Sequence, residues 1–193
     1  MPWACAIHSG SPGTRRTDVA DIGQNIVEEL SPVPKGGNLG WNVWEASFKY
    51  AGRAGVDTTA RRSDAAMTFP VAEYDHTDSI LTNRAAVTGV VVYRSGPITQ
   101  LRNRILFGDN PSGEVLHVSA DDPQAAGQDH IRRVLFNDKG EVKTYLQLIR
   151  EKNTQQGKTP ATRADLRFGT GPDDQVFLLN KADGVIRMLM PAR

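Results

Sequence analysis

The sequence predicts an all-β fold made of many short antiparallel strands. Short apolar or alternating stretches recur along the 193-residue chain, and almost every one ends at a turn signal. These signals include Gly96-Pro97, Asn110-Pro111-Ser112-Gly113 and Gly171-Pro172-Asp173-Asp174. Such a pattern is typical of a sandwich, a barrel or a propeller. At roughly 40–50 residues per four-stranded blade, the chain has room for about three to four blades.

Composition and charge narrow the possible partners. With 23 basic and 22 acidic side chains, the net charge of +1 gives no support for a nucleic-acid partner. No apolar run approaches the roughly 18–20 residues needed to cross a bilayer. The single cysteine, Cys5, excludes a disulfide within the chain. An apolar fraction of 39% is enough for an ordinary hydrophobic core.

The first 17 residues differ in character from the rest of the chain. Residues 1–17 have no visible period, and Arg15-Arg16 occupies a place where an alternating strand would be expected. The stretch also lacks the charged start and apolar centre of a secretory signal. We expect residues 1–17 to be a truncated or irregular segment, and residues 18–193 to form the propeller portion.

The segment from Asp18 to Glu45 combines two predicted strands with glycine-rich turns. An apolar run ends at Ile22, the chain turns at Gly23-Gln24-Asn25, and alternation resumes through 26–30. The paired acids Glu28 and Glu29 come shortly after this turn. Carboxylate and main-chain oxygens brought together by tight turns are what Ca²⁺ requires. The alternative is a plain hairpin turn followed by two exposed acids.

The remainder of the chain is predicted from the same signals. Residues 41–70 show little periodicity and are expected to form a long loop, whereas 149–156 could form a helical turn or a surface loop. Further strands are predicted at 71–74, 87–93, 104–107, 114–119, 133–136, 143–148, 165–169, 175–180 and 185–190.

Several motifs, in order, resemble one known family. They are ADIGQN (20–25), EEL (28–30), GGNLGWNVWE (36–45), PVAEYDH (70–76), AVTGVVVYR (86–94), LFGDNPSGEV (106–115) and ADLRFGTGPDDQVFLLNKADGVIRML (164–189). Together they resemble the glucose/sorbosone dehydrogenase family, soluble sugar dehydrogenases with a six-bladed β-propeller and pyrroloquinoline quinone (PQQ) as cofactor. The resemblance covers roughly residues 18–190. It implies the C-terminal part of such a propeller, in a parent family whose members are periplasmic or secreted.

The resemblance also implies a reaction and a set of metal ligands. The reaction is oxidation of a sugar or polyol hydroxyl, with PQQ as acceptor and Ca²⁺ assisting. A Ca²⁺ beside the quinone would take main-chain oxygens of Gly23 and Gln24. A separate, structural Ca²⁺ would use Glu29 and Leu39, where the family has a tyrosine in place of Leu39.

Four further residues match positions near the cofactor in the family. Arg94, Arg163 and Arg167 supply cations suited to the quinone carboxylates, and His76 lies in a motif of the same family. The alternatives are that these arginines are surface cations and that His76 has a structural role. The sequence leaves open whether Arg163 or Arg167 faces the cofactor.

No catalytic residue is assigned in this chain. In the family a histidine acts as general base towards the sugar hydroxyl, and it comes from an earlier blade. None of the four histidines here matches it, so we expect the chain alone to be inactive. Two alternatives remain: a non-enzymatic propeller that binds a carbohydrate or protein, like those resembling hedgehog-interacting proteins, and a self-contained lectin-like β domain.

Overall fold

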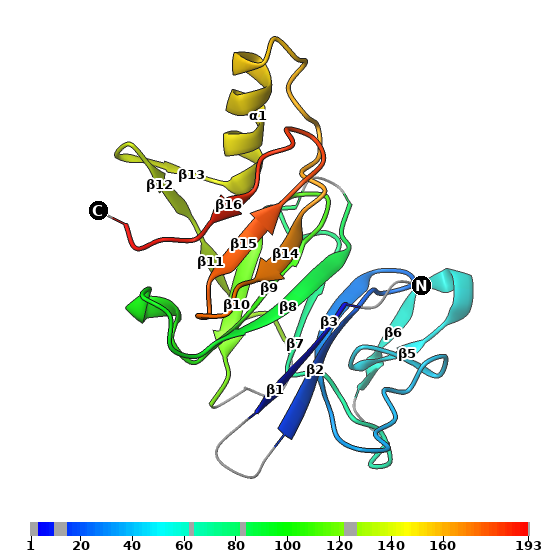
Figure 1. Cartoon of the computed structure of the whole chain (residues 1–193). Helices are drawn as coiled ribbons and strands as arrows, with labels where there is room; N and C mark the ends of the chain where they lie inside the picture. The colour runs from blue at the N-terminus through cyan, green and yellow to red at the C-terminus, as the bar shows by residue number, and fades with distance from the viewer. Residues whose placement is uncertain (1–3, 10–14, 62–63, 82–83, 122–126, 193) are drawn as a thin grey trace.

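Two four-stranded antiparallel sheets form the centre of the computed structural model, which describes residues 4–9, 15–61, 64–81, 84–121 and 127–192 (Figure 1). The first sheet has the strand order β1-β2-β3-β7, from β1 (Ala4–Ser9), β2 (Arg15–Asp21), β3 (Val27–Val33) and β7 (Ala72–Asp75). The second has the order β11-β10-β9-β8, from β8 (Val87–Tyr93), β9 (Arg104–Asp109), β10 (Val115–Ser119) and β11 (Arg132–Val134). Neighbours within each sheet pair antiparallel, as in propeller blades.

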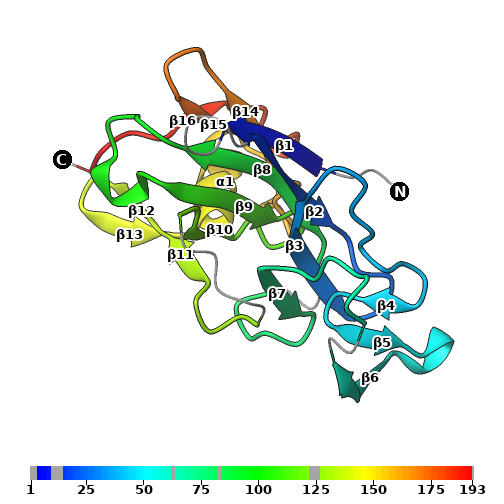
Figure 2. The same ribbon diagram turned by 90° about the horizontal axis from the view of Figure 1, so that it is seen from below.

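A third, three-stranded sheet continues the same arrangement. It has the order β14-β15-β16, from β14 (Arg167–Thr170), β15 (Val176–Leu179) and β16 (Arg187–Met188). Strand β8 packs beside β1 and β2 of the first sheet and beside β14 of the third. The three sheets therefore follow one another as neighbouring blades (Figure 2).

Two insertions extend beyond these blades. Between β3 and β7 the chain forms a small sheet of β4 (Trp44–Glu45), β5 (Phe48–Tyr50) and β6 (Val56–Arg61), with the 3₁₀ turn η1 (Gly52–Ala54). Between β11 and β14 it forms the hairpin of β12 (Phe136–Asp138) and β13 (Glu141–Lys143), then helix α1 (Tyr145–Gln155). A second 3₁₀ turn, η2 (Thr99–Leu101), comes after β8.

The hydrophobic cores lie between successive blades. Leu30 and Tyr74 of the first blade pack with Ile105 and Phe107 of the second in one buried cluster. Another cluster joins Val115 to α1 and to the third blade; its buried members are Val115, Tyr145, Leu146, Ile149, Ala164, Leu166 and Leu178. Apolar burial on both faces of the second blade explains why its strands read as nearly continuous apolar runs.

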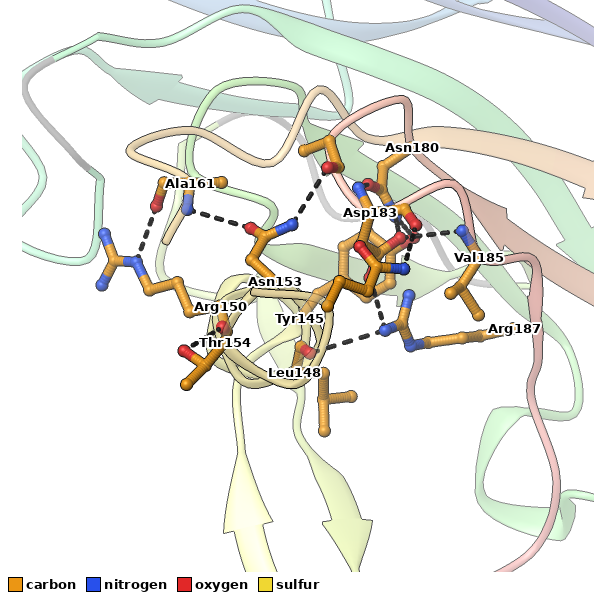
Figure 3. A network of polar contacts seen from close by, with 12 residues as sticks. Tyr145, Leu148, Arg150, Asn153, Thr154, Ala161, Asn180, Asp183, Val185 and Arg187 are labelled. Atoms are coloured by element: carbon orange, nitrogen blue, oxygen red, sulfur yellow. Dashed lines mark hydrogen bonds and ion pairs between the residues drawn. The ribbon is translucent and has the colours of Figure 1, made fainter. Parts of the chain in front are cut away.

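Helix α1 fixes the loop that leads into the third blade and also the connection between β15 and β16 (Figure 3). The Asn153 side chain donates to the Ala182 carbonyl oxygen at 3.0 Å and accepts from the Ala161 backbone N–H at 3.0 Å. The Arg150 side chain donates to the Ala161 carbonyl oxygen at 2.9 Å. Arg187 closes the network with an ion pair to Asp183 at 2.6 Å.

The prediction of an all-β, partial propeller is confirmed, and its strands are mostly where the pattern placed them. Two local predictions were wrong. Residues 41–70 are not one long loop, because they contain β4, β5 and β6. Residues 143–148 are not a strand, because α1 begins at Tyr145 and continues through most of 149–156. The division into a truncated or irregular segment 1–17 and a propeller portion 18–193 stays a prediction; β1 and the first residues of β2 lie within 1–17.

In the described part of the chain, no helix has the length and apolar character required to cross a bilayer.

Candidate functional site

The turn between β2 and β3 is held by one buried carboxylate. Glu45, only 3% exposed, accepts backbone hydrogen bonds from Asn25, Ile26 and Val27 at 2.7–3.1 Å. The Asn25 side chain donates to the carbonyl oxygens of Gly52 and Gly55. A side chain at position 23 would collide with the backbone, because a Cβ there would lie 2.0 Å from the Val27 oxygen. This crowding explains the glycine of the turn.

A cavity of about 400 Å³ opens beside this turn. All four predicted metal ligands, Gly23, Gln24, Glu29 and Leu39, line it. The other lining residues come from β2 and the turn after it, from β3, from the connection between β3 and β4, and from β4 itself: Val19, Asp21, Ile22, Val27, Val33, Gly37, Asn38, Gly40, Trp41, Trp44 and Glu45. The structure thus brings together the residues that the sequence suggested for metal binding, while their role as ligands stays a prediction.

Three carboxylates stand in a row across the first blade beside the cavity. Glu29 on β3 pairs with Asp21 on β2 and with Glu73 on β7. Burial, followed by the negative charge of Asp21, raises the pKa of Glu29 to about 8, although the Ser31 hydroxyl donates to it at 3.0 Å. Burial also raises the pKa of Asp21. Like charges directly opposite one another are unfavourable, so a cation would relieve this repulsion.

The oxygen atoms of this cavity suit a hard cation better than a transition metal. No three His, Cys, Asp or Glu side chains converge as a metal cluster in the ranges that the structure describes. A cation here would therefore need main-chain oxygens as well as carboxylates, which is the kind of ligand set predicted with Gly23 and Gln24. The residues present fit Ca²⁺.

His76 lies next to the same turn, and its partner Glu28 joins the first two blades. Its backbone N–H donates to the Ile26 carbonyl oxygen at 3.0 Å, and its Nε2 lies 2.7 Å from Oε1 of Glu28. Glu28 is fully buried and also accepts from the Val87 backbone N–H at 2.8 Å. The hydrogen bond to Glu28 raises the pKa of His76.

Two of the predicted arginines lie at this same end of the blades. The Asn110 backbone N–H donates to the Ala86 carbonyl oxygen beside the start of β8, and its side-chain oxygen accepts from Arg163 at 2.8 Å. The Asn110 side chain also donates to the Leu166 carbonyl oxygen at 3.0 Å, next to Arg167. Arg163 forms an ion pair with Asp165 at 2.6 Å, and Arg167 is exposed.

Arg94 lies at the opposite end of β8. Its guanidinium contacts Asn103 and Asp121, just beyond the last residue of the strand. A strand of seven residues separates it from Ala86, a length of about 23 Å. His76, Arg163 and Arg167 are therefore grouped with the turn at Gly23, whereas Arg94 is not. None of these four side chains lines the cavity.

Sequence reasoning missed three functional candidates beside the cavity: Asp21, Glu45 and Trp44. The position of Asp21 could have been predicted from the sequence, because a hairpin that turns around Asn25 places residue 21 opposite residue 29. Glu45 and Trp44 approach from about twenty positions downstream, and no local signal connects them to the turn.

Known sequences match this chain over only part of their own length. No family model matches the chain. It is similar to the HIPL1 protein of Arabidopsis thaliana, with 26% identity over 197 residues, covering 100% of this chain and 26% of that protein. It also resembles the HIPL2 protein of Arabidopsis thaliana, with 30% identity over 95 residues, or 49% of this chain and 13% of that protein. The chain thus spans about a quarter or less of these relatives' lengths.

Two solved structures share the fold. The soluble aldose sugar dehydrogenase of Escherichia coli, in its apo-form, matches with a TM-score of 0.55 and 17% identity over 96% of this chain and 43% of that chain. A glucose dehydrogenase matches with a TM-score of 0.52 and 15% identity over 91% of this chain and 41% of that chain. At these identities the likeness concerns the fold alone. The chain therefore has the fold of part of a β-propeller of the kind found in these sugar dehydrogenases.

Proposed function

We propose that this chain supplies part of the calcium- and quinone-binding wall of a propeller that oxidises a hydroxyl group of a sugar or polyol. The observation that carries the proposal is a grouping at one end of the blades. The turn at Gly23, His76, Arg163 and Arg167 all lie there, linked through Glu28 and Asn110. For the full-length protein we propose the periplasmic or secreted location of the parent family.

In this proposal, oxygen atoms of the wall would bind Ca²⁺ and its arginines would bind the carboxylates of the quinone. Gly23 and Gln24 would offer main-chain oxygens to a Ca²⁺ beside the quinone, and Glu29 with Leu39 would hold a second Ca²⁺. Arg163 and Arg167 would bind quinone carboxylates, and Asn110 would keep Arg163 in place. His76, held by Glu28, would border the same site.

When bound, the quinone would supply the acceptor for the two electrons of the oxidation, and a Ca²⁺ held by Gly23 and Gln24 would supply a Lewis acid. This chain's own side chains would bind and orient the cofactor. We assign no general base among them, so the oxidation itself would need residues outside this chain.

The second candidate function is binding of a carbohydrate or protein without oxidation. It is favoured by the cavity itself, whose mostly apolar wall with a few convergent polar groups is typical of binding pockets. The two candidates differ in one requirement, because only oxidation needs the quinone.

A PQQ titration with excess Ca²⁺, followed by the absorbance of the quinone, tests the first proposal. We expect saturable binding that Arg163→Ala and Arg167→Ala each weaken about tenfold, the loss of a charge-assisted hydrogen bond. Arg94→Ala is the internal comparison, and the geometry predicts little effect because Arg94 lies at the far end of β8. Absence of quinone binding would leave the second candidate.

A further inference from the structure

Two arginines and a histidine gather on one face of the second blade. His117 on β10 pairs directly with Arg132 on β11 and with Leu106 on β9. Arg104 lies two residues before Leu106 on the same strand, so strand alternation places its side chain on the same face, diagonal to His117. Leu106 packs in one buried cluster with Val176 of the third blade. Beside that contact, His117 and Arg104 are half-buried and Arg132 is exposed.

The imidazole of His117 lies beside positive charge and away from carboxylates. Burial, followed by the charges of Arg104 and Arg132, lowers the pKa of His117 to about 4, and no acid in the described ranges acts on the ring. The ring is therefore neutral near pH 7, with one nitrogen as donor and the other as acceptor. Nδ1 is buried without a hydrogen-bond partner among the described residues. Because a buried N–H without an acceptor costs free energy, we place the hydrogen on Nε2.

The two arginines beside this ring also lack acidic partners. Arg133, the next residue on β11, pairs with Glu114 at 2.7 Å. In the part of the chain that the structure describes, neither Arg104 nor Arg132 forms an ion pair. Arg132 donates instead to two backbone carbonyl oxygens, at 2.7 and 3.0 Å, which hold its guanidinium without neutralising it. An anion between these two cations would relieve their repulsion.

The available donors define the class of anion. Each guanidinium presents a planar fork of N–H groups that matches the oxygens of a phosphate, sulfate or carboxylate group. A carboxylate has only two oxygens, whereas a tetrahedral phosphate or sulfate group has enough for both guanidinium groups and for Nε2 of His117. A metal cation is excluded here by the two positive charges.

We propose that Arg104, Arg132 and His117 form a binding site for a phosphate or sulfate group, either free or esterified to a larger molecule. The two arginines bind the oxygens through charge-assisted hydrogen bonds, and Nε2 of His117 donates to a further oxygen. None of these three side chains lines the cavity beside Gly23. The site uses neither Ca²⁺ nor the quinone, so its failure is distinguishable from failure of the proposed function.

NMR titration of the full 193-residue chain at pH 7.5 with sodium sulfate, sodium phosphate and methyl phosphate tests the site. The ionic strength is held constant with NaCl, because added salt screens surface charges. We expect saturable shifts of the His117 ring signals with at least one of the three anions. Tighter binding of the inorganic anions indicates a free ion as the ligand, and equal or tighter binding of methyl phosphate indicates an esterified group.

Charge-removing variants separate a specific site from general attraction. Arg132→Gln changes an exposed side chain and should leave the fold intact, yet weaken binding about tenfold, the factor for a hydrogen bond between charged groups. Arg104→Gln should weaken it by a similar factor. The control is Arg53→Gln, which removes the same charge from an exposed arginine on η1 and should bind within about twofold of the wild type.

Three results would overturn the inference. The first is that none of the anions gives a saturable shift of the His117 ring by about 50 mM. The second is that Arg132→Gln or Arg104→Gln binds like the wild type. The third is that Arg53→Gln weakens binding as much as these two variants do, because the anion would then be attracted by net charge alone.

Discussion

At the scale of single residues, buried carboxylates accept hydrogen bonds from backbone N–H groups at turns and strand ends of this fold. Glu45 accepts from the turn after β2, Glu28 from Val87, Asp109 from Ala86 and Glu73 from Ser47. Each acid satisfies N–H groups that no neighbouring strand reaches, which buried backbone requires. These acids connect segments that are far apart in sequence, so they position the candidate site.

Removing the Glu45 carboxylate should loosen the turn at Gly23. Glu45→Ala leaves three backbone N–H groups without their acceptor, and we expect a loss of about 2–3 kcal/mol in the free energy of unfolding. Glu45→Gln retains one acceptor oxygen and should lose less. Urea denaturation measures both variants, and amide exchange at residues 25–27 should rise in the alanine variant. A loss below about 0.5 kcal/mol would be that of an ordinary surface substitution and would refute this role.

The His76–Glu28 pair should make stability depend on pH. The hydrogen bond to Glu28 raises the folded pKa of His76 above its ordinary value of 6.5. Protonated His76 therefore stabilises the fold fully below about pH 6.5, and this contribution is lost as the pH rises through the raised pKa. We expect His76→Gln to cost about 1 kcal/mol more at pH 5.5 than at pH 9.

The control for that measurement is His130→Gln, because His130 bonds the Val71 carbonyl oxygen at 2.8 Å instead of a carboxylate. Unfolding by urea at several pH values gives both differences. A His76→Gln cost that does not change with pH would contradict the charged pair.

From the local pattern alone, only the turn at Gly23 and the acids after it were predictable, whereas Leu39, which also lines the cavity, came from the family resemblance. The turn at Gly23 and the acids after it lie within seven positions of one another, and Gly23, Gln24 and Glu29 share the cavity. The anchoring of that turn by Glu45, and the contact of Arg163 with Asn110 across 53 positions, depend on tertiary packing. No sequence pattern encodes those distances.

At the scale of elements, strand β8 is shaped by a bulge at Gly89. The pairing of β8 with β9 shifts register between Thr88 and Val90, and Gly89 has a φ of +63°. A Cβ at this position would lie 2.3 Å from Cδ2 of Phe168 on the neighbouring blade. The glycine therefore permits both the bulge and the close approach of β14.

Substitution of Gly89 should separate these two effects. Gly89→Ala combines the cost of a positive φ with a collision, and we expect a loss of about 3 kcal/mol. Gly157→Ala is the matched control, because Gly157 has a φ of +69° with nothing within 4 Å of the added methyl group. It should cost about 1 kcal/mol. Equal losses for the two variants in thermal or urea unfolding would contradict the packing against Phe168.

Helix α1 could have been predicted from its start, although the apolar pattern suggested a strand. Thr144 and Gln147 form a capping box, in which the Thr144 hydroxyl accepts from the Gln147 N–H and the Gln147 side chain accepts from the Thr144 N–H. The apolar residues Leu146 and Ile149 lie in the first turns of the helix, three positions apart, and pack into one core. Combined with this capping signal, their spacing favours a helix.

At the scale of the whole molecule, the blades and their order were predictable, and the insertions were not. In an antiparallel meander, each strand reads as an alternating or continuous apolar run between two turn signals. This pattern predicted most strands of the three blades. The sheet of β4 to β6 has strands of only two to six residues, too short to show a period. It nevertheless supplies Trp44 and Glu45 to the cavity.

The melting temperature of the chain as a function of Ca²⁺ tests the proposed calcium-binding wall most directly. If the cavity at Glu29 binds the ion, the melting temperature should rise and saturate, with about 2.7 kcal/mol of added stability at 100 times the dissociation constant. Glu29→Gln should remove most of that rise, whereas Glu141→Gln, at an exposed acid on β13, should not. A wild-type melting temperature that does not respond to Ca²⁺ would contradict the calcium-binding wall on which the proposed function depends.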